Sequence, residues 1–153
     1  PQTHTEIPMF LAKTFKAASV VLMITATAVP ALAGGSQIWI EQYGANNEIG
    51  GGQSGYRQRL TVIQDGHSNF SINTQDGRRN EAAVGQVGVN NMVDTDQQGR
   101  RNSVGVAQFG WDNEAVVRQN GRRNNAAIVQ NGHNNSSSVS QNGSNNSVAI
   151  VQN

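Results

Sequence analysis

Glutamine recurs in this chain at one fixed interval, and that period constrains the fold more than any other feature. Eleven glutamines stand 11 residues apart, from Gln42 to Gln152, without insertion or deletion. Ten of them have a glycine two places later, and in nine of these ten units an asparagine follows three residues further on. Such a period predicts one small unit repeated along the chain, whose function belongs to the stack and not to a pocket.

Three residue types form the repeated columns. The glutamines are Gln42, Gln53, Gln64, Gln75, Gln86, Gln97, Gln108, Gln119, Gln130, Gln141 and Gln152. The glycines are Gly44, Gly55, Gly66, Gly77, Gly88, Gly99, Gly110, Gly121, Gly132 and Gly143. The asparagines are Asn47, Asn69, Asn80, Asn91, Asn102, Asn113, Asn124, Asn135 and Asn146, with Gln58 in place of one. We predict that these amides stack into ladders at the strand ends, because an unsatisfied buried amide costs about 1–3 kcal/mol. The glycines predict turns with a positive φ.

Within each unit, apolar or small residues alternate with polar ones. Counted from the asparagine as position 0, positions 2 and 4 are inward candidates, as in Leu60 with Val62 and Val148 with Ile150. This alternation over seven residues predicts a strand with one buried face, whereas a helix needs apolar residues at a period of 3.6. The four residues around each glycine then form the turn.

Odd and even units differ, so the larger repeat has 22 residues. Units that begin at 36, 58, 80, 102, 124 and 146 carry larger inward residues than the units between them. A meander of antiparallel hairpins does not explain this difference, but a coil of strand, turn, strand, turn does. We therefore predict an all-β, two-sheet parallel β-solenoid with 22-residue rungs about 4.8 Å apart and amyloid-like stacking.

The first 33 residues lie outside the repeat. Basic residues precede an apolar run over 17–29, and a small-residue cleavage signal ends at Ala33. This order is typical of a secretory signal peptide, which we assign to residues 9–33. A membrane anchor is the alternative, although the run is shorter than the roughly 20 residues of a spanning helix. Residues 1–8 are interpreted as an artefact or a misassigned start.

The repeat domain covers residues 34–153, and neither of its ends shows a capping sequence. Its first strand begins near Ser36, and its last unit holds the apolar pair Val148 and Ile150. Open strand edges template the addition of another chain. We therefore expect head-to-tail polymerisation, with the chain itself as its main partner.

Composition offers little for catalysis or metal binding. The chain has no cysteine, which leaves no disulfide framework and no thiolate metal site. No nucleophile–base–acid set, metal cluster or phosphate loop stands out from the repeat, so we predict no enzyme and no cofactor. His67 and His133 fall on one turn column three rungs apart, which is about 14 Å at the strand spacing and too far to share a metal.

Three arginine pairs recur 22 residues apart at the turns. They are Arg78, Arg79, Arg100, Arg101, Arg122 and Arg123. The pattern predicts a line of positive charge suited to a polyanion such as anionic polysaccharide, lipopolysaccharide or DNA. The alternative interpretation is a solvated edge whose self-repulsion slows assembly.

The motif Gln-x-Gly-x-x-Asn, spaced by 11 residues and doubled into 22-residue units, resembles the curlin repeat of bacterial curli subunits. The segment SQIWIEQYG at residues 36–44 is similar to a first curlin repeat, and the resemblance extends over residues 34–153. It implies a secreted functional amyloid, a curli-type fimbrium on the bacterial surface that supports adhesion and biofilm matrix. It also implies a nucleator subunit and curli export and chaperone proteins as partners.

Two other functions stay open at this point. Regular repeats favour the major fibre subunit, whereas Arg-rich turns are closer to those of the nucleator that seeds the fibre. The other alternative is a non-polymerising secreted β-solenoid adhesin that binds polyanions through its arginine pairs.

Overall fold

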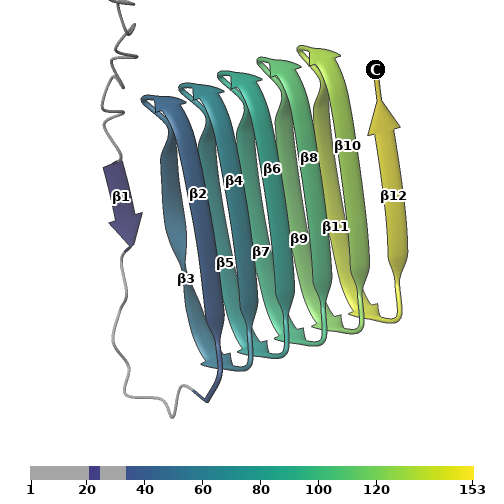
Figure 1. Cartoon of the computed structure of the whole chain (residues 1–153). Coiled ribbons are helices and arrows are strands. Elements are labelled where there is room, and N and C mark those ends of the chain that lie inside the picture. Colours follow the sequence, from purple (N-terminus) through teal and green to yellow (C-terminus); the bar gives the residue numbers. More distant parts are fainter. Residues whose placement is uncertain (1–20, 25–33) are drawn as a thin grey trace, which may run out of the picture.

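The computed structural model describes residues 21–24 and 34–153, which form strands joined by short turns (Figure 1). The strands are β1 (Val21–Ile24), β2 (Gln37–Ala45), β3 (Glu48–Tyr56), β4 (Arg59–His67), β5 (Phe70–Arg78), β6 (Glu81–Val89), β7 (Met92–Arg100), β8 (Ser103–Trp111), β9 (Glu114–Arg122), β10 (Asn125–His133), β11 (Ser136–Ser144) and β12 (Ser147–Gln152). The predicted signal peptide lies outside the described residues except for 21–24, and residues 1–8 lie wholly outside them. Among the described residues, no helix is long and apolar enough to cross a membrane.

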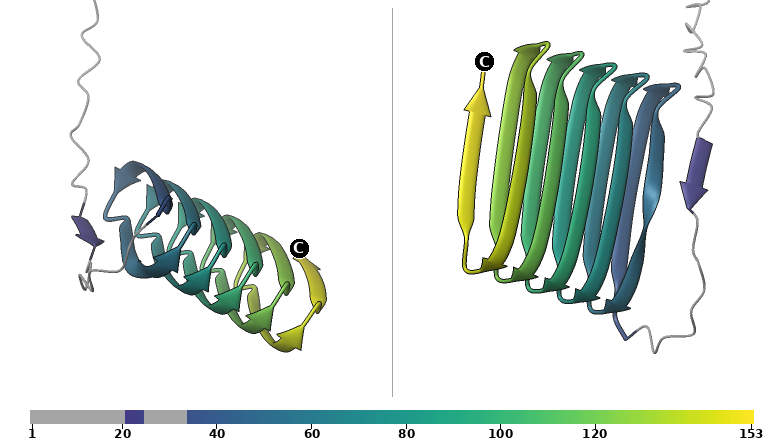
Figure 2. Two further views of the ribbon diagram at one scale, coloured as in Figure 1. Left: turned by 90° about the horizontal axis from the view of Figure 1, so that it is seen from below. Right: turned by 180° about the vertical axis from the view of Figure 1, so that it is seen from behind.

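The strands alternate between two parallel sheets that face each other across a thin core (Figure 2). Sheet A has the order β1-β3-β5-β7-β9-β11, and sheet B has the order β12-β10-β8-β6-β4-β2. From β2 onward, paired strand residues lie 22 places apart along the chain, as Gln64 and Gln86 do. The predicted two-sheet parallel solenoid with 22-residue rungs is therefore confirmed. Strand β1 joins the edge of β3 outside this register, since Leu22 pairs with Ile49.

Inward side chains stack in columns between the sheets and make the core. Sheet B contributes the larger residues, such as Leu60, Val62 and Ile128, which are at most 4% exposed. Because a rung buries only a few small side chains, it cannot offset the entropy of ordering 22 residues, and stability comes from stacking. Val148 and Ile150 pack against this core but stay half-buried, since β12 has a paired strand on one side only among the described residues.

The strands are longer and the turns shorter than the alternation predicts. Each of β2 to β11 has nine residues, not seven, because parallel pairing continues through the glycine, as between Gly66 and Gly88. Two residues then connect the strands, not four. The first connecting residue is left-handed in all ten connections, with φ between 54° and 62°, and none of these ten is glycine. The reversal is therefore shared between a glycine of positive φ and a left-handed residue two places later.

Candidate functional site

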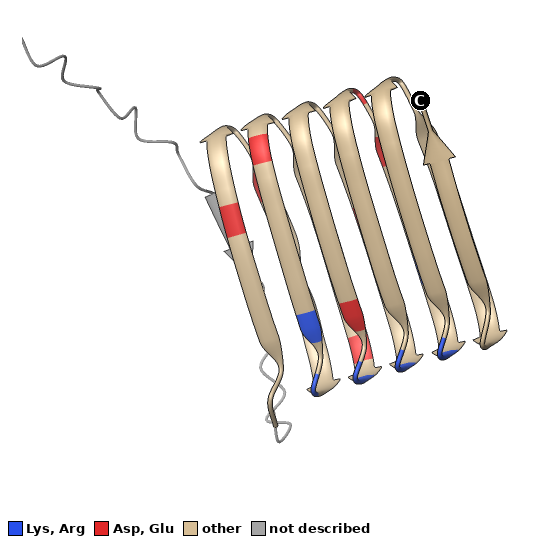
Figure 3. Cartoon of the chain, turned by 45° about the vertical axis from the view of Figure 1, so that its right-hand side comes forward, with Lys and Arg blue, Asp and Glu red and all other residues tan. Residues whose placement is uncertain are grey.

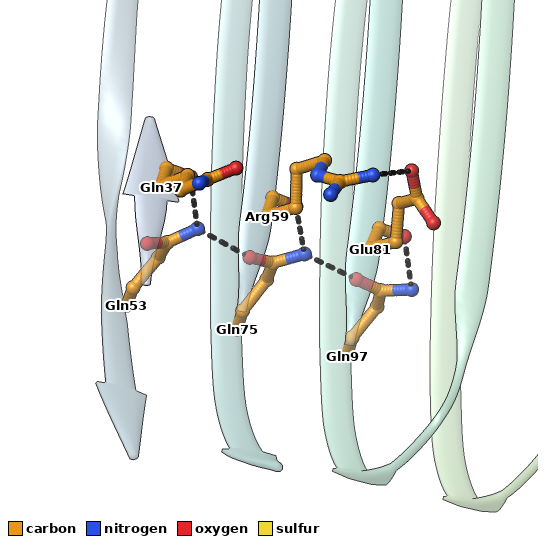
Figure 4. Close-up of polar contacts among 6 residues, drawn as sticks. All are labelled: Gln37, Gln53, Arg59, Gln75, Glu81 and Gln97. Carbon is orange, nitrogen blue, oxygen red and sulfur yellow. Dashed lines mark hydrogen bonds and ion pairs between the residues drawn. The ribbon is translucent and has the colours of Figure 1, made fainter. Parts of the chain in front are cut away.

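The glutamines form two buried hydrogen-bonded ladders, one in each sheet. From Gln42 to Gln130, the Nε2 of each repeat glutamine donates to the Oε1 of the glutamine 22 residues later, over 2.6 to 3.0 Å in all nine bonds. From Gln53 onward, each Nε2 also donates across the core to a backbone carbonyl 16 residues earlier, as Gln97 does to Glu81 O over 2.9 Å (Figure 4). Both amide hydrogens are therefore used in the inner rungs, and the ladder has one direction, with donors aimed toward β11 and β12.

The asparagine ladders run in the opposite direction. Asn69 Oδ1 accepts from the backbone N of Asn91 over 3.2 Å and from its Nδ2 over 3.1 Å. The Nδ2 of Asn69 in turn donates to Gly88 O over 3.0 Å. Gln58 takes the asparagine position in one rung, where its Nε2 donates to Gly77 O over 3.2 Å and its buried Oε1 has no described donor. The asparagine Oδ1 therefore accepts from the following rung, opposite in sense to the glutamine Oε1, whereas the asparagine Nδ2 donates toward both tips.

The glycine column allows adjacent rungs to approach at the strand ends. The ten glycines have φ between 99° and 132°. A Cβ on Gly88 would lie 1.8 Å from Gly110 O, and the same close approach recurs from Gly44 to Gly121. Gly132 and Gly143 have no following rung among the described residues, and a Cβ there meets no heavy atom closer than 3.8 Å.

A small polar cluster lies in the core of sheet A. Thr95 Oγ1 donates to Asn73 Oδ1 over 2.8 Å, and Asn73 Nδ2 donates to Ser71 Oγ over 2.8 Å. All three side chains are fully buried. Sequence analysis placed these positions inward but missed the bonds between them, because the link from Asn73 to Thr95 depends on the rung register.

Replacing Thr95 with valine tests this cluster. We expect Thr95→Val to leave Asn73 Oδ1 without its donor and to lower the free energy of unfolding by about 1–3 kcal/mol. The measurement is a denaturant titration followed by far-UV circular dichroism. Thr74→Val makes the same change on the exposed face of β5 and is expected to shift stability by less than about 0.5 kcal/mol. Equal shifts in the two variants would contradict a role for the cluster.

One edge of the solenoid carries a line of arginines where the chain passes from sheet A to sheet B (Figure 3). We call the following set the Arg edge: Arg57, Arg78, Arg79, Arg100, Arg101, Arg122 and Arg123. All seven are exposed, and the turns of the opposite edge hold no arginine or lysine. The structure thus brings the three arginine pairs to one edge and adds Arg57, which the pair pattern missed.

The histidine column lies on the opposite edge. The ring of His133 stacks on Trp111 of the preceding rung, with centroids 5.1 Å apart and an interplanar angle of 15°. His67 stands further down the same column, paired in register with Val89. Within residues 21–24 and 34–153, no group of three or more potential metal-ligating side chains gathers.

The repeat sequence matches a known protein-family model. A family model described as the curlin associated repeat matches residues 88–121, 110–143 and 121–153. Residues 88–153 therefore consist of curlin associated repeats, which supports the resemblance of the chain to the curlin family. No curated protein and no solved structure matched the chain in the corresponding searches.

The curlin architecture continues beyond the residues that the family model matches. Between Gln64 and Gln86, before residue 88, the ladder bond is 2.8 Å, within the range of the later rungs. The early rungs differ in side chains, because Gln58 replaces an asparagine and Asn73 takes an inward position. The curlin repeat and the solenoid it builds are structural elements, and they indicate a curli-type fibre subunit.

Proposed function

We propose that residues 34–153 form the structural subunit of an extracellular curli-type fibre that grows by end-to-end stacking of identical copies. In this proposal residues 9–33 are a signal peptide that is removed on secretion, and the fibre supports adhesion and biofilm matrix. A nucleator subunit and curli export and chaperone proteins are the proposed partners. The support comes from the curlin repeats and from the hydrogen-bonding groups left open at the two tips of the coil.

The tip formed by β2 and β3 presents open acceptors. Gln42 Oε1 is buried and accepts no hydrogen bond from the described residues, whereas the Oε1 of Gln64 accepts from Gln42. A buried acceptor without a donor costs about 1–3 kcal/mol, so this tip gains free energy when a donor arrives. The unmet Gln42 oxygen is the single observation that carries the proposal.

The tip formed by β11 and β12 presents open donors. In the described structure, Gln141 Nε2 donates only to Asn125 O and Gln152 Nε2 donates only to Ser136 O. Each amide nitrogen has two hydrogens, so one hydrogen stays free in each. For the two glutamine ladders, donors at one tip match acceptors at the other, whereas two like tips bring glutamine donors against donors or acceptors against acceptors. Copies therefore join head to tail and the fibre is polar.

Continuation of the coil specifies which strands meet. After β12 in sheet B the next strand belongs on β11, so β2 of an added copy pairs with β11 and its β3 pairs with β12. The edge of β3 is occupied by β1, which lies inside the proposed signal peptide. Removal of that segment frees the edge for the next copy.

Substitution at the open tip tests the fibre proposal. Ile38 points toward the core yet is 48% exposed, because no described rung covers it, whereas its neighbour Trp39 points outward. In residues 34–153, Ile38→Lys is tolerated in a single solenoid but places an unpaired charge inside a fibre junction. We expect seeded elongation, followed by thioflavin-T fluorescence, to slow by at least about tenfold. The control Trp39→Lys is expected to elongate within about twofold of the unaltered protein, since its charge stays in water.

Two outcomes would count against the proposal. One is a β-rich single particle that ignores sonicated seeds, which would favour the non-polymerising adhesin. The other is an equal effect of the two lysine substitutions. A nucleator role is the second candidate, favoured by the Arg edge, and it predicts that small amounts of this chain shorten the lag of another curlin subunit.

A further inference from the structure

The Arg edge carries charge that the fold does not balance. The one salt bridge among the described residues joins Arg59 to Glu81 over 3.4 Å, and both lie on strand faces outside the Arg edge. Asp76 and Glu81 each lie two residues from the first arginine pair, but Asp76 makes no ion pair and Glu81 pairs with Arg59. The pKa of Arg101 is lowered, first by the charge of Arg79, and then by slight desolvation and by Arg123 and the other arginines around it. Each rung adds to the potential of its neighbours.

Backbone conformation makes these arginines costly to place. Four of the seven arginines occupy the left-handed position of the turn; Arg79, for example, has a φ of 59°. The other six turns hold asparagine four times, serine once and aspartate once at this position. Asparagine tolerates the left-handed conformation better than arginine does. Arg57 stacks on Tyr56, but Arg79, Arg101 and Arg123 make no ion pair within the described residues, and their repeated use at this position points to a function outside the fold.

The register arranges the charges in two straight columns. Arg78 pairs with Arg100 and Arg100 with Arg122, while Arg101 N donates to Arg78 O over 3.0 Å. Successive guanidinium groups thus start from backbones about 4.8 Å apart. This spacing is close to the length of one pyranose unit, so a chain with one anionic group per sugar meets one rung per sugar. Guanidinium forks bind carboxylate and sulfate through paired hydrogen bonds.

Aromatic stacking, which binds single-stranded nucleic acid, is absent from this edge in the described structure. Tyr56 is its one aromatic residue, and its ring is covered by Arg57 at 4.9 Å and Arg78 at 5.9 Å. Duplex DNA winds away from a straight line of charge, whereas a linear glycan can follow it. We propose that the Arg edge is a binding site for a linear acidic polysaccharide, whose carboxylate or sulfate groups lie along the two arginine columns.

A matched pair of double variants tests the site with labelled oligogalacturonate as the probe. Arg79→Asn with Arg101→Asn removes two charges from the left-handed column of the Arg edge, where asparagine already occurs at Asn145. We expect binding to weaken by about tenfold, measured by co-sedimentation with fibres or by anisotropy on soluble protein. Arg59→Asn with Arg118→Asn removes the same charge from the exposed strand faces and is expected to bind within twofold. Because binding is measured on either form, the test does not depend on polymerisation.

Three outcomes would overturn the assignment. Equal weakening in the two double variants would show dependence on net charge alone. Absence of oligogalacturonate binding at low salt would remove the site. Tighter binding of a short DNA duplex than of oligogalacturonate would instead assign the Arg edge to nucleic-acid binding. Lysine at positions 79 and 101 keeps the charge and loses the fork, so a loss smaller than that of the asparagine variant supports paired hydrogen bonding.

Discussion

Substitution of Gly88 by alanine is expected to break the stack at the middle of the coil. The added Cβ would lie 1.8 Å from Gly110 O, which is backbone and cannot rotate away. The φ of 127° is also one that L side chains rarely adopt. Strain of this backbone class and overpacking each cost about 1–3 kcal/mol, so we expect a loss of roughly 2–6 kcal/mol. That loss is a large part of the stability of an ordinary domain.

The measurement is the denaturant midpoint of the protein, together with amide exchange resolved by rung. We expect Gly88→Ala to lower the midpoint and to expose the amides around β6 and β8 first, since rungs contact only their neighbours. Gly85→Ala is the matched control on the same strand, because a Cβ there meets nothing within 4 Å. Gly85→Ala is expected to be neutral or to stabilise the protein by up to about 1 kcal/mol, because alanine lowers the conformational entropy of the unfolded chain. If the two variants lost equal stability, the close approach at Gly88 would not limit the fold.

Much of this architecture could be predicted from the sequence because the repeat has two nested periods. Alternation of residues such as Leu60 and Val62 indicates one buried face, and the difference between odd and even units indicates two sheets. A strict 22-residue spacing then leaves parallel, in-register stacking as the arrangement that places like residues together. These inferences need only the period-two geometry of strands and the cost of burying amides.

Backbone detail could not be predicted in the same way. Glycine at a fixed position predicts a turn, yet Gly66 is still paired within the sheet. The residues that connect β4 to β5 are Ser68 and Asn69. Left-handed arginines such as Arg79 break the local preference, so composition gave no warning of them. Hydrogen-bond direction is also invisible in a list of residues, since Gln and Asn amides both donate and accept. Only the register shows that the two kinds of ladder point in opposite directions.

Replacing Gln97 by leucine is expected to destabilise the coil at least as strongly, because one side chain joins three groups. Gln97 Oε1 accepts from Gln75 over 2.7 Å, and its Nε2 donates to Glu81 O and to Gln119 Oε1. Leucine fills the space but leaves a donor and two acceptors unmet in the core. At about 1–3 kcal/mol for each of these three buried groups, we expect a loss of roughly 3–9 kcal/mol in unfolding free energy. Gln98→Leu, the same change on the exposed neighbour, is expected to cost less than about 0.5 kcal/mol.

A second substitution in the same column separates the ladder from simple packing. Gln75→Leu added to Gln97→Leu removes the donor that the first change left unmet, so the double variant is expected to lose less than the sum of the single losses. We expect a coupling of about 1–2 kcal/mol, measured in a double-mutant cycle by denaturant titration. Additive losses would mean that the amides act as independent space-filling groups. Coupling of this sign along the axis would also favour the proposed growth at an open tip, since each added rung supplies the donor or acceptor that the previous one lacks.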